Sequence, residues 1–180
     1  MTPSVADIGT YVFTGEERLL LDTNIWLSVY GPDPTKRRRS ATYQDAFRRM
    51  RAAGSEIFLD ALILSEFINA WARLAFHQRW PDASSRKFKR FRDSGDFQPV
   101  AQEIAVSATR ICRVVRRCET GFSSCDVGSL LVRYAQGRSD FNDLLVSRLC
   151  DAHGLVFVTD DADLRGSGHA ILTANRRLLD

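Results

Sequence analysis

Aspartates stand at the ends of two apolar runs that predict buried strands. Asp22 closes the run RLLLDT, and Asp160 and Asp161 follow the run LVFVT, which ends at Thr159. In open α/β sheets, ligands bind beyond the carboxyl ends of the strands. If both strands are central and parallel, these polar side chains share one rim. A carboxylate at such a place is costly unless a positive charge compensates it, so we expect a divalent cation there.

Two predicted helices add further carboxylates that could reach the same rim. Glu66 lies in the first turns of a helix that follows the second strand. Asp140 and Asp143 are three residues apart near the start of another helix, so they project from one face. A helix N-terminus also favours an acid for its own sake, and Asp140 can be explained as an N-cap. Asp143 is followed by an apolar run, which is harder to reconcile with solvated surface.

Oxygen ligands without histidine or thiolate suit magnesium or manganese better than zinc. The four cysteines of the chain show no C-x-x-C spacing, which gives a zinc site little support. Two hard cations held by carboxylates can activate water and stabilise the leaving oxygen when a phosphodiester is hydrolysed. The residue types therefore predict metal-dependent cleavage of a phosphodiester.

The basic residues gather in two segments, although the net charge is only +3. Residues 36–51 and 79–92 are basic, whereas residues 140–163 are acidic. Most of the basic residues are arginines, whose planar fork donates two hydrogen bonds to phosphate. Solvated helix faces are the alternative explanation. The side chains that we expect to hold a phosphate backbone are Arg37, Arg38, Arg39, Arg48, Lys87, Lys89 and Arg90.

The elements that must position these residues alternate along a chain of 180 residues, a length typical of one domain. Apolar runs predict strands at 18–23, 56–61 and 155–159, and an edge strand at 169–174. Helical periodicity predicts helices at 24–30, 35–53, 61–78, 100–118, 126–136 and 140–154. Alternating strands and helices indicate an α/β fold with a mostly parallel sheet, and residues 79–136 form extra helical material.

Four segments resemble the PIN-domain ribonucleases, a family that includes VapC-like toxin endoribonucleases. The matching pieces are LLLDTNIWL (19–27), ILSEF (63–67), DFNDLLVSRLC (140–150) and GLVFVTDDADL (154–164), in the family's order. The resemblance implies one PIN-like domain over residues 1–180. Its fold would be three-layered α/β/α, with a central mostly parallel sheet and a helical insertion at about 79–136.

The resemblance also implies an activity and a set of site residues. The activity is that of a magnesium- or manganese-dependent endoribonuclease, with the toxin of a type II toxin–antitoxin pair as its biological setting. Its partners would be an RNA substrate, a cognate antitoxin and a second copy in a homodimer. Asp22, Glu66, Asp143 and Asp161 match the family's catalytic and metal-binding acids. Asn24 and Thr159 match its supporting polar residues, Asp140 and Asp160 are alternative acids, and Asp163 matches the acid of the usual D-F ending, although Leu164 stands where phenylalanine is common.

Two other classes of function compete with this interpretation. One is a non-catalytic RNA-binding or scaffold module that keeps the fold, and the full set of acids speaks against it. The other is a DNA-directed nuclease, which uses similar carboxylates. No apolar run approaches the ~20 residues that span a bilayer, and the N-terminus lacks the pattern of a secretory signal, so we expect a cytoplasmic protein without a membrane anchor.

Overall fold

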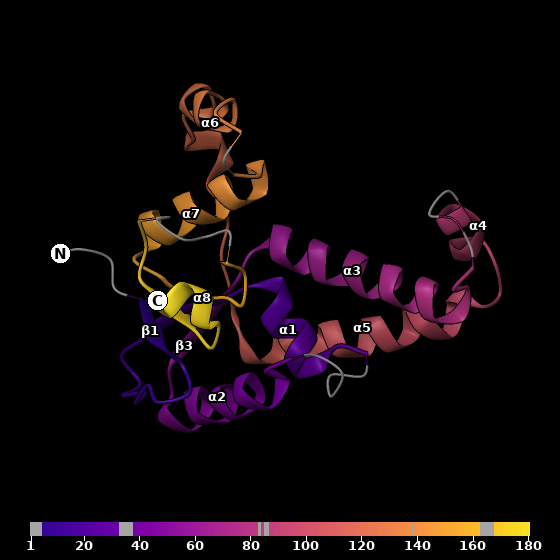
Figure 1. Ribbon diagram of the computed structural model, residues 1–180, viewed down its shortest axis with the longest axis horizontal. Coiled ribbons are helices and arrows are strands. Elements are labelled where there is room, and N and C mark those ends of the chain that lie inside the picture. Colours follow the sequence, from indigo (N-terminus) through magenta and orange to yellow (C-terminus); the bar gives the residue numbers. More distant parts are fainter. Residues whose placement is uncertain (1–4, 33–37, 83, 85–86, 138, 163–167) are drawn as a thin grey trace.

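The computed structural model describes residues 5–32, 38–82, 84, 87–137, 139–162 and 168–180 (Figure 1). Their strands form one sheet in the order β1-β6-β5-β2-β3-β4, and every neighbouring pair is parallel. The strands are β1 (Val5–Asp7), β2 (Arg18–Leu21), β3 (Glu56–Leu59), β4 (Arg116–Arg117), β5 (Val156–Val158) and β6 (Ile171–Thr173).

Strand β2 lies at the centre of the sheet between β3 and β5. Its Leu19, Leu20 and Leu21 have no solvent exposure, as expected for a parallel strand covered on both faces. The chain continues the pairing one residue further, because the Asp22 amide donates to the Val158 carbonyl at 2.9 Å. The end of β2 therefore lies beside the end of β5, which is where the sequence places its aspartates.

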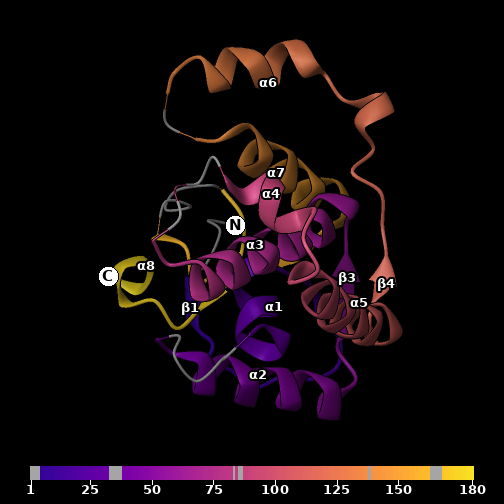
Figure 2. The same ribbon diagram turned by 90° about the vertical axis from the view of Figure 1, so that its right-hand side faces the viewer.

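Helices cover both faces of the sheet and complete a three-layer α/β/α fold (Figure 2). Helix α1 packs against α2 and α3, and α3 packs against α5. Helices α7 and α6 lie on the opposite side of the strands from α1 and α2. The helices are α1 (Thr23–Tyr30), α2 (Ser40–Ala53), α3 (Ala61–Arg79), α4 (Phe88–Arg92), α5 (Phe97–Val114), α6 (Val127–Tyr134), α7 (Phe141–His153) and α8 (Arg176–Leu179), with a 3-10 turn at Phe122–Ser124.

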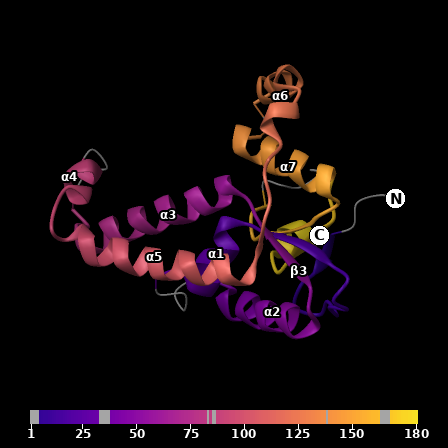
Figure 3. The same cartoon turned by 180° about the vertical axis from the view of Figure 1, so that it is seen from behind.

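Two apolar clusters hold these layers together. The larger one surrounds the sheet and includes Trp26, Phe67 and Phe76, all of which are buried. The smaller one joins α6 to α7 through Leu130, Leu144 and Leu145. Seen from behind, α3 and α5 run side by side away from the sheet, and α4 lies at their far end (Figure 3). None of the helices in the described part of the chain is long and apolar enough to cross a membrane.

The sheet extends beyond the predicted strands on both sides, and the predicted edge was wrong. The predicted edge strand at 169–174 corresponds to β6, which is not an edge, because β1 pairs with it on the outer side. The sequence did not predict β1, whose three residues are too short to show a pattern. At the other edge, the predicted helix over 100–118 ends at Val114. Residues 116–117 form β4 instead, because they pair with β3.

Helix α2 begins later than the predicted helix over 35–53. Its first residue is Ser40, and Arg39 before it adopts a left-handed conformation with φ of 66°. Residues 35–37 lie outside the described part of the chain. The left-handed Arg39 breaks helical geometry, so the basic run cannot continue the helix backwards.

Residues 79–136 contribute to the main fold as well as to its periphery. Helix α5 packs along α3, and β4 adds a sixth strand beside β3. Helix α6 stands beyond α7 (Figure 2). The description of the chain as one domain with an insertion at about 79–136 stays a prediction.

Candidate active site

Asp22 lies where β2 ends, and it is the N-cap of α1. Its carboxylate accepts hydrogen bonds from the Thr23 amide at 2.6 Å, the Asn24 side-chain amide at 2.5 Å and the Thr159 hydroxyl at 2.6 Å. Burial raises the pKa of Asp22 to about 6, and the charges of Glu66 and Asp161 act in the same direction against these hydrogen bonds. The carboxylate is therefore fixed in place and held where negative charge is unfavourable.

Asn24 and Thr159 connect Asp22 to the residues that follow β5. The Asn24 amide nitrogen also donates to the Thr159 hydroxyl oxygen at 3.3 Å, and its carbonyl oxygen accepts from the Asp160 amide at 3.1 Å. The Thr159 hydroxyl oxygen accepts from the Asp161 amide at 3.0 Å. Thr159 is fully buried. These two polar side chains fix the backbone that carries Asp161 relative to Asp22.

Glu66 reaches the same place from the second turn of α3. Its Oε2 atom accepts a hydrogen bond from the Thr23 hydroxyl at 3.0 Å. Thr23 is buried, whereas Glu66 is exposed to solvent. The carboxylate is thus held at one oxygen and open at its outer side.

Asp143 and Asp140 come from the start of α7 and differ in role. Asp140 is the N-cap, and its carboxylate accepts from the Asn142 amide at 2.8 Å. Asp143 lies in the first turn and is half-buried. Burial raises the pKa of Asp143, and the charges of Asp140, Asp161 and Glu66 raise it further. Capping accounts for the position of Asp140 but not for that of Asp143.

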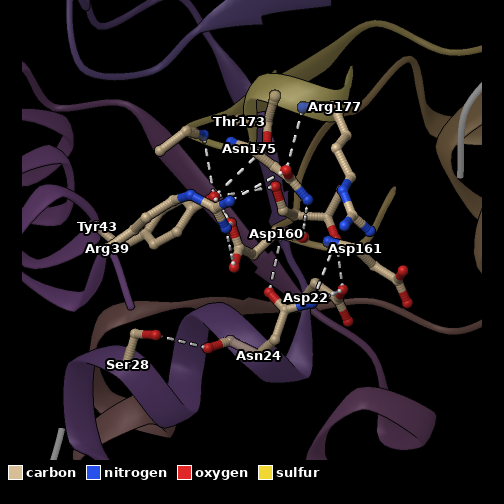
Figure 4. A network of polar contacts seen from close by, with 12 residues as sticks. Asp22, Asn24, Ser28, Arg39, Tyr43, Asp160, Asp161, Thr173, Asn175 and Arg177 are labelled. Atoms are coloured by element: carbon tan, nitrogen blue, oxygen red, sulfur yellow. Dashed lines mark hydrogen bonds and ion pairs between the residues drawn. The ribbon is translucent and has the colours of Figure 1, made fainter. Parts of the chain in front are cut away.

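Asp160 and Asp161 are adjacent in sequence but have separate surroundings (Figure 4). Asp160 forms an ion pair with Arg39, whose Nη1 atom lies 2.7 and 2.8 Å from its two oxygens, and it accepts from the Tyr43 hydroxyl at 2.7 Å. Asp161 is exposed, and its charge acts on Asp22 and Asp143. Asp160 is therefore engaged away from the other acids, and Asp161 faces them.

A surface cavity joins the acids of α3 and α7 to Asp161. Its lining residues are Glu66, Tyr134, Ala135, Gly137, Ser139, Asp140, Phe141, Asp143 and Asp161. Asp22 is not among the lining residues, but the charges of Glu66 and Asp161, which line the cavity, help to raise the pKa of Asp22 after burial. The structure thus brings Asp22, Glu66, Asp143 and Asp161 to one rim.

The donor set fits a hard divalent cation by the chemistry of its residues, although not by their spacing within the described part of the chain. Every candidate ligand is a carboxylate, and neighbouring carboxylates raise the pKa of both Asp22 and Asp143. A cation among them would relieve this repulsion, and oxygen ligands suit magnesium or manganese. Within the described residues, no three histidine, cysteine, aspartate or glutamate side chains form a ready metal-binding group.

The expected phosphate-binding residues do not surround the acids as one patch. Arg39 is committed to Asp160, and Arg48 pairs with Asp45 at 3.1 Å on the surface of α2. Arg38 is exposed and lines a different cavity, together with Arg39 and residues near α8. Arg37 and the candidate acid Asp163 lie outside the described residues.

Lys87, Lys89 and Arg90 lie at α4, away from the acids. Helix α4 packs on the C-terminal half of α3, where Phe88 contacts Phe76. Ten residues of helix separate Phe76 from Glu66, which is about 15 Å along the axis. A nucleic acid that contacts both the acids and this basic end would have to span this distance (Figure 1).

Sequence reasoning missed the residues that hold the loop after β5. Asn175 donates from its side-chain amide to the Asp160 carbonyl at 2.7 Å, and the Ala174 amide donates to the Tyr43 hydroxyl at 3.0 Å. Burial raises the pKa of the Tyr43 hydroxyl well above its usual value. Nothing in the sequence pairs Tyr43 or Arg39 with a position more than 115 residues away.

Comparison with known proteins agrees with this architecture. The PIN domain family model matches residues 19–167, so the chain belongs to the PIN domain family. PIN domains are generally nucleases that use divalent metals such as Mg²⁺ or Mn²⁺. This coarser part of the predicted activity therefore has support, as does the predicted α/β/α fold.

One solved structure extends the likeness to the whole chain. The crystal structure of PAE2754 from Pyrobaculum aerophilum superposes with a TM-score of 0.50 and covers 98% of this chain and 96% of that chain. The two sequences are 15% identical, so the likeness concerns the fold alone. No curated protein is significantly similar to the chain in sequence.

Proposed function

We propose that the protein is a magnesium- or manganese-dependent endoribonuclease. The observation that carries the proposal is the convergence of Asp22, Glu66, Asp143 and Asp161 on one rim, where their charges oppose one another. Bringing such carboxylates together costs free energy, which a bound cation would offset. Membership of the PIN domain family supports nuclease activity, and the choice of RNA is our proposal.

The four acids and the two polar side chains beside them would have different functions in the site. Asp22, Asp143 and Asp161 would ligate the metal, and Glu66 would ligate it or hold a water molecule beside it. Asn24 and Thr159 donate hydrogen bonds to the Asp22 carboxylate and thereby fix its orientation. Divalent cations lower the pKa of water and neutralise charge on a phosphodiester in its transition state.

The test is cleavage of an end-labelled RNA pool with magnesium, with manganese and with EDTA. Asp143→Asn removes a proposed ligand charge, and Asp45→Asn is the matched control, because Asp45 is a half-exposed acid on α2 that forms surface ion pairs with Arg48 and Arg49. We expect metal-dependent cleavage that Asp143→Asn abolishes and Asp45→Asn leaves intact. Equal cleavage by wild type and Asp143→Asn would refute the assignment.

The same assay separates RNA from DNA as substrate. Adding unlabelled DNA of the same sequence should not compete with RNA cleavage at equal concentration. Preferential cleavage of DNA would replace the proposed ribonuclease with a DNA-directed nuclease. Metal-independent RNA binding without any cleavage would favour the non-catalytic module.

We further propose that the enzyme acts as the toxin of a toxin–antitoxin pair in the cytoplasm, with an antitoxin protein and a second copy of the chain as its partners. The support is its family together with the exposed positions of Glu66 and Asp161. Induced expression in bacteria should arrest growth, and Asp143→Asn should not. Normal growth with active wild-type enzyme present would argue against a toxin.

A further inference from the structure

Two aromatic side chains, Tyr134 and Phe141, line the cavity that contains the acids, and the proposed chemistry does not use them. Tyr134, the last residue of α6, lines the cavity together with Glu66, Asp143 and Asp161. Half of Tyr134 is exposed, with a relative accessibility of 50%. The ring is therefore accessible to a ligand that enters the cavity.

The ring of Tyr134 is supported from one side and remains open for stacking. Phe141 meets it edge-to-face, with ring centroids 6.3 Å apart and an interplanar angle of 88°. This perpendicular contact restrains the ring without placing a parallel ring against it. Phe141 itself packs on the buried apolar cluster that joins α6 to α7, so its contact with Tyr134 is anchored to the interior of the protein.

The charges in the cavity limit what can bind there. The ionisable side chains among its described lining residues are three aspartates, a glutamate and the tyrosine, so no described cation lines it. From these described residues, a nucleic acid gains electrostatic attraction only through bound metal. Tyr134 offers a second kind of favourable contact, because every nucleobase has a face that can stack on such a ring.

We propose that Tyr134, supported by Phe141, is a stacking platform for an unpaired base next to the phosphodiester that the acids cleave. The inference rests on the proposed nuclease function and names its substrate class, because a base can stack on Tyr134 only when it has left its own helix. The enzyme accordingly selects single strands and loops over duplex.

Neighbouring residues of α6 provide matched controls. Leu131 and Val132 are also exposed, at 52% and 66%, but they do not line the cavity. A protein partner that covers the apolar surface of α6 would use all three side chains. A stacked base would use Tyr134 alone, and Tyr134→Phe would preserve it.

The experiment measures binding of a short fluorescent single-stranded RNA in Ca²⁺, a hard cation that suits the oxygen ligands, with a gel to confirm that the RNA stays intact. We expect Tyr134→Ala to weaken binding by about 5- to 150-fold, the range for loss of one base–aromatic stack. Tyr134→Phe and Leu131→Ala should bind as wild type does. With an abasic oligonucleotide, wild type and Tyr134→Ala should bind equally, and duplex RNA should bind wild type more weakly than the single strand does.

Two results would overturn the stacking platform. The first is unchanged single-strand binding by Tyr134→Ala, and the second is an equal loss in Leu131→Ala, which would indicate a general apolar surface instead. Failure of the nuclease proposal is distinguishable, since it would show as absence of cleavage by wild type under every metal. Thermal melting of each variant checks folding, and exposed positions on α6 should leave it unchanged.

Discussion

The ion pair between Arg39 and Asp160 is expected to anchor the loop that carries Asp161. The two side chains are 18% and 26% exposed, and one Arg39 nitrogen lies within 2.8 Å of both carboxylate oxygens. The Arg39 fork also donates to the Asn175 side-chain oxygen at 3.2 Å. Removing the arginine leaves a largely buried carboxylate with fewer partners.

The expected cost follows from this geometry and from the backbone. Loss of hydrogen bonds to a charged, partly buried group costs about 1.5–3 kcal/mol. Arg39 also has a φ of 66°, and a left-handed conformation costs a residue with a side chain about 1 kcal/mol relative to glycine. We therefore expect Arg39→Ala to lower the free energy of unfolding by about 2 kcal/mol, and Arg39→Gly by about 1 kcal/mol less than that.

The assay is urea unfolding of the metal-free protein in a double-mutant cycle with Asp160→Asn. The coupling energy between the two positions should be about 2 kcal/mol. Arg48→Ala is the control, because Arg48 pairs with Asp45 in the solvent, with side chains 77% and 49% exposed. That substitution should change stability by less than about 0.5 kcal/mol.

Two outcomes would refute this reasoning. A coupling energy below about 0.5 kcal/mol would mean that the ion pair does not hold the loop. An Arg39→Gly variant less stable than Arg39→Ala would mean that the left-handed backbone is not strained. If the loop is held as described, Arg39→Ala should also reduce RNA cleavage, because Asp161 follows Asp160 directly.

Three further predictions concern other parts of the molecule. Burial raises the pKa of Glu17, but hydrogen bonds from the backbone and side chains around it outweigh burial and lower the pKa to about 2. Glu17→Gln should therefore lower the free energy of unfolding by about 1–2 kcal/mol at pH 7. In urea titrations this difference should shrink as the pH falls from about 4.5 towards 2. Asp22→Asn should raise the melting temperature of the metal-free protein at pH 7, because the raised pKa of Asp22 makes its charge destabilising there, and the gain should disappear below about pH 4. The triple alanine variant of Lys87, Lys89 and Arg90 should bind long RNA more weakly, and its binding should depend less steeply on salt. It should still cleave, at the wild-type rate, an oligonucleotide that is too short to reach α4. An unaltered salt dependence would mean that α4 does not contact the RNA.

The sequence by itself determined the identity of the central elements and most of the acids. A continuous apolar run such as the three leucines of β2 can be stable only in the interior of a sheet, so its following aspartate had to lie at the sheet's rim. The starts of the helices after Asp22 and Asp140 could be predicted from the sequence, because an N-cap aspartate accepts hydrogen bonds from backbone amides of its own helix. Local patterns of this kind depend on neighbours in the chain, which the sequence shows.

Tertiary structure decided what depends on distant neighbours. Asp160 and Asp161 have the same chemistry and adjacent positions, and Asp160 differs in that its carboxylate is bound by Arg39 and Tyr43, more than 115 residues away. The short strands β1 and β4 carry no pattern of their own and exist because β6 and β3 offer open edges to pair with. Tyr134 likewise lines the cavity because α6 packs on α7. In each case the deciding contact joins residues whose separation along the chain leaves no periodic signal.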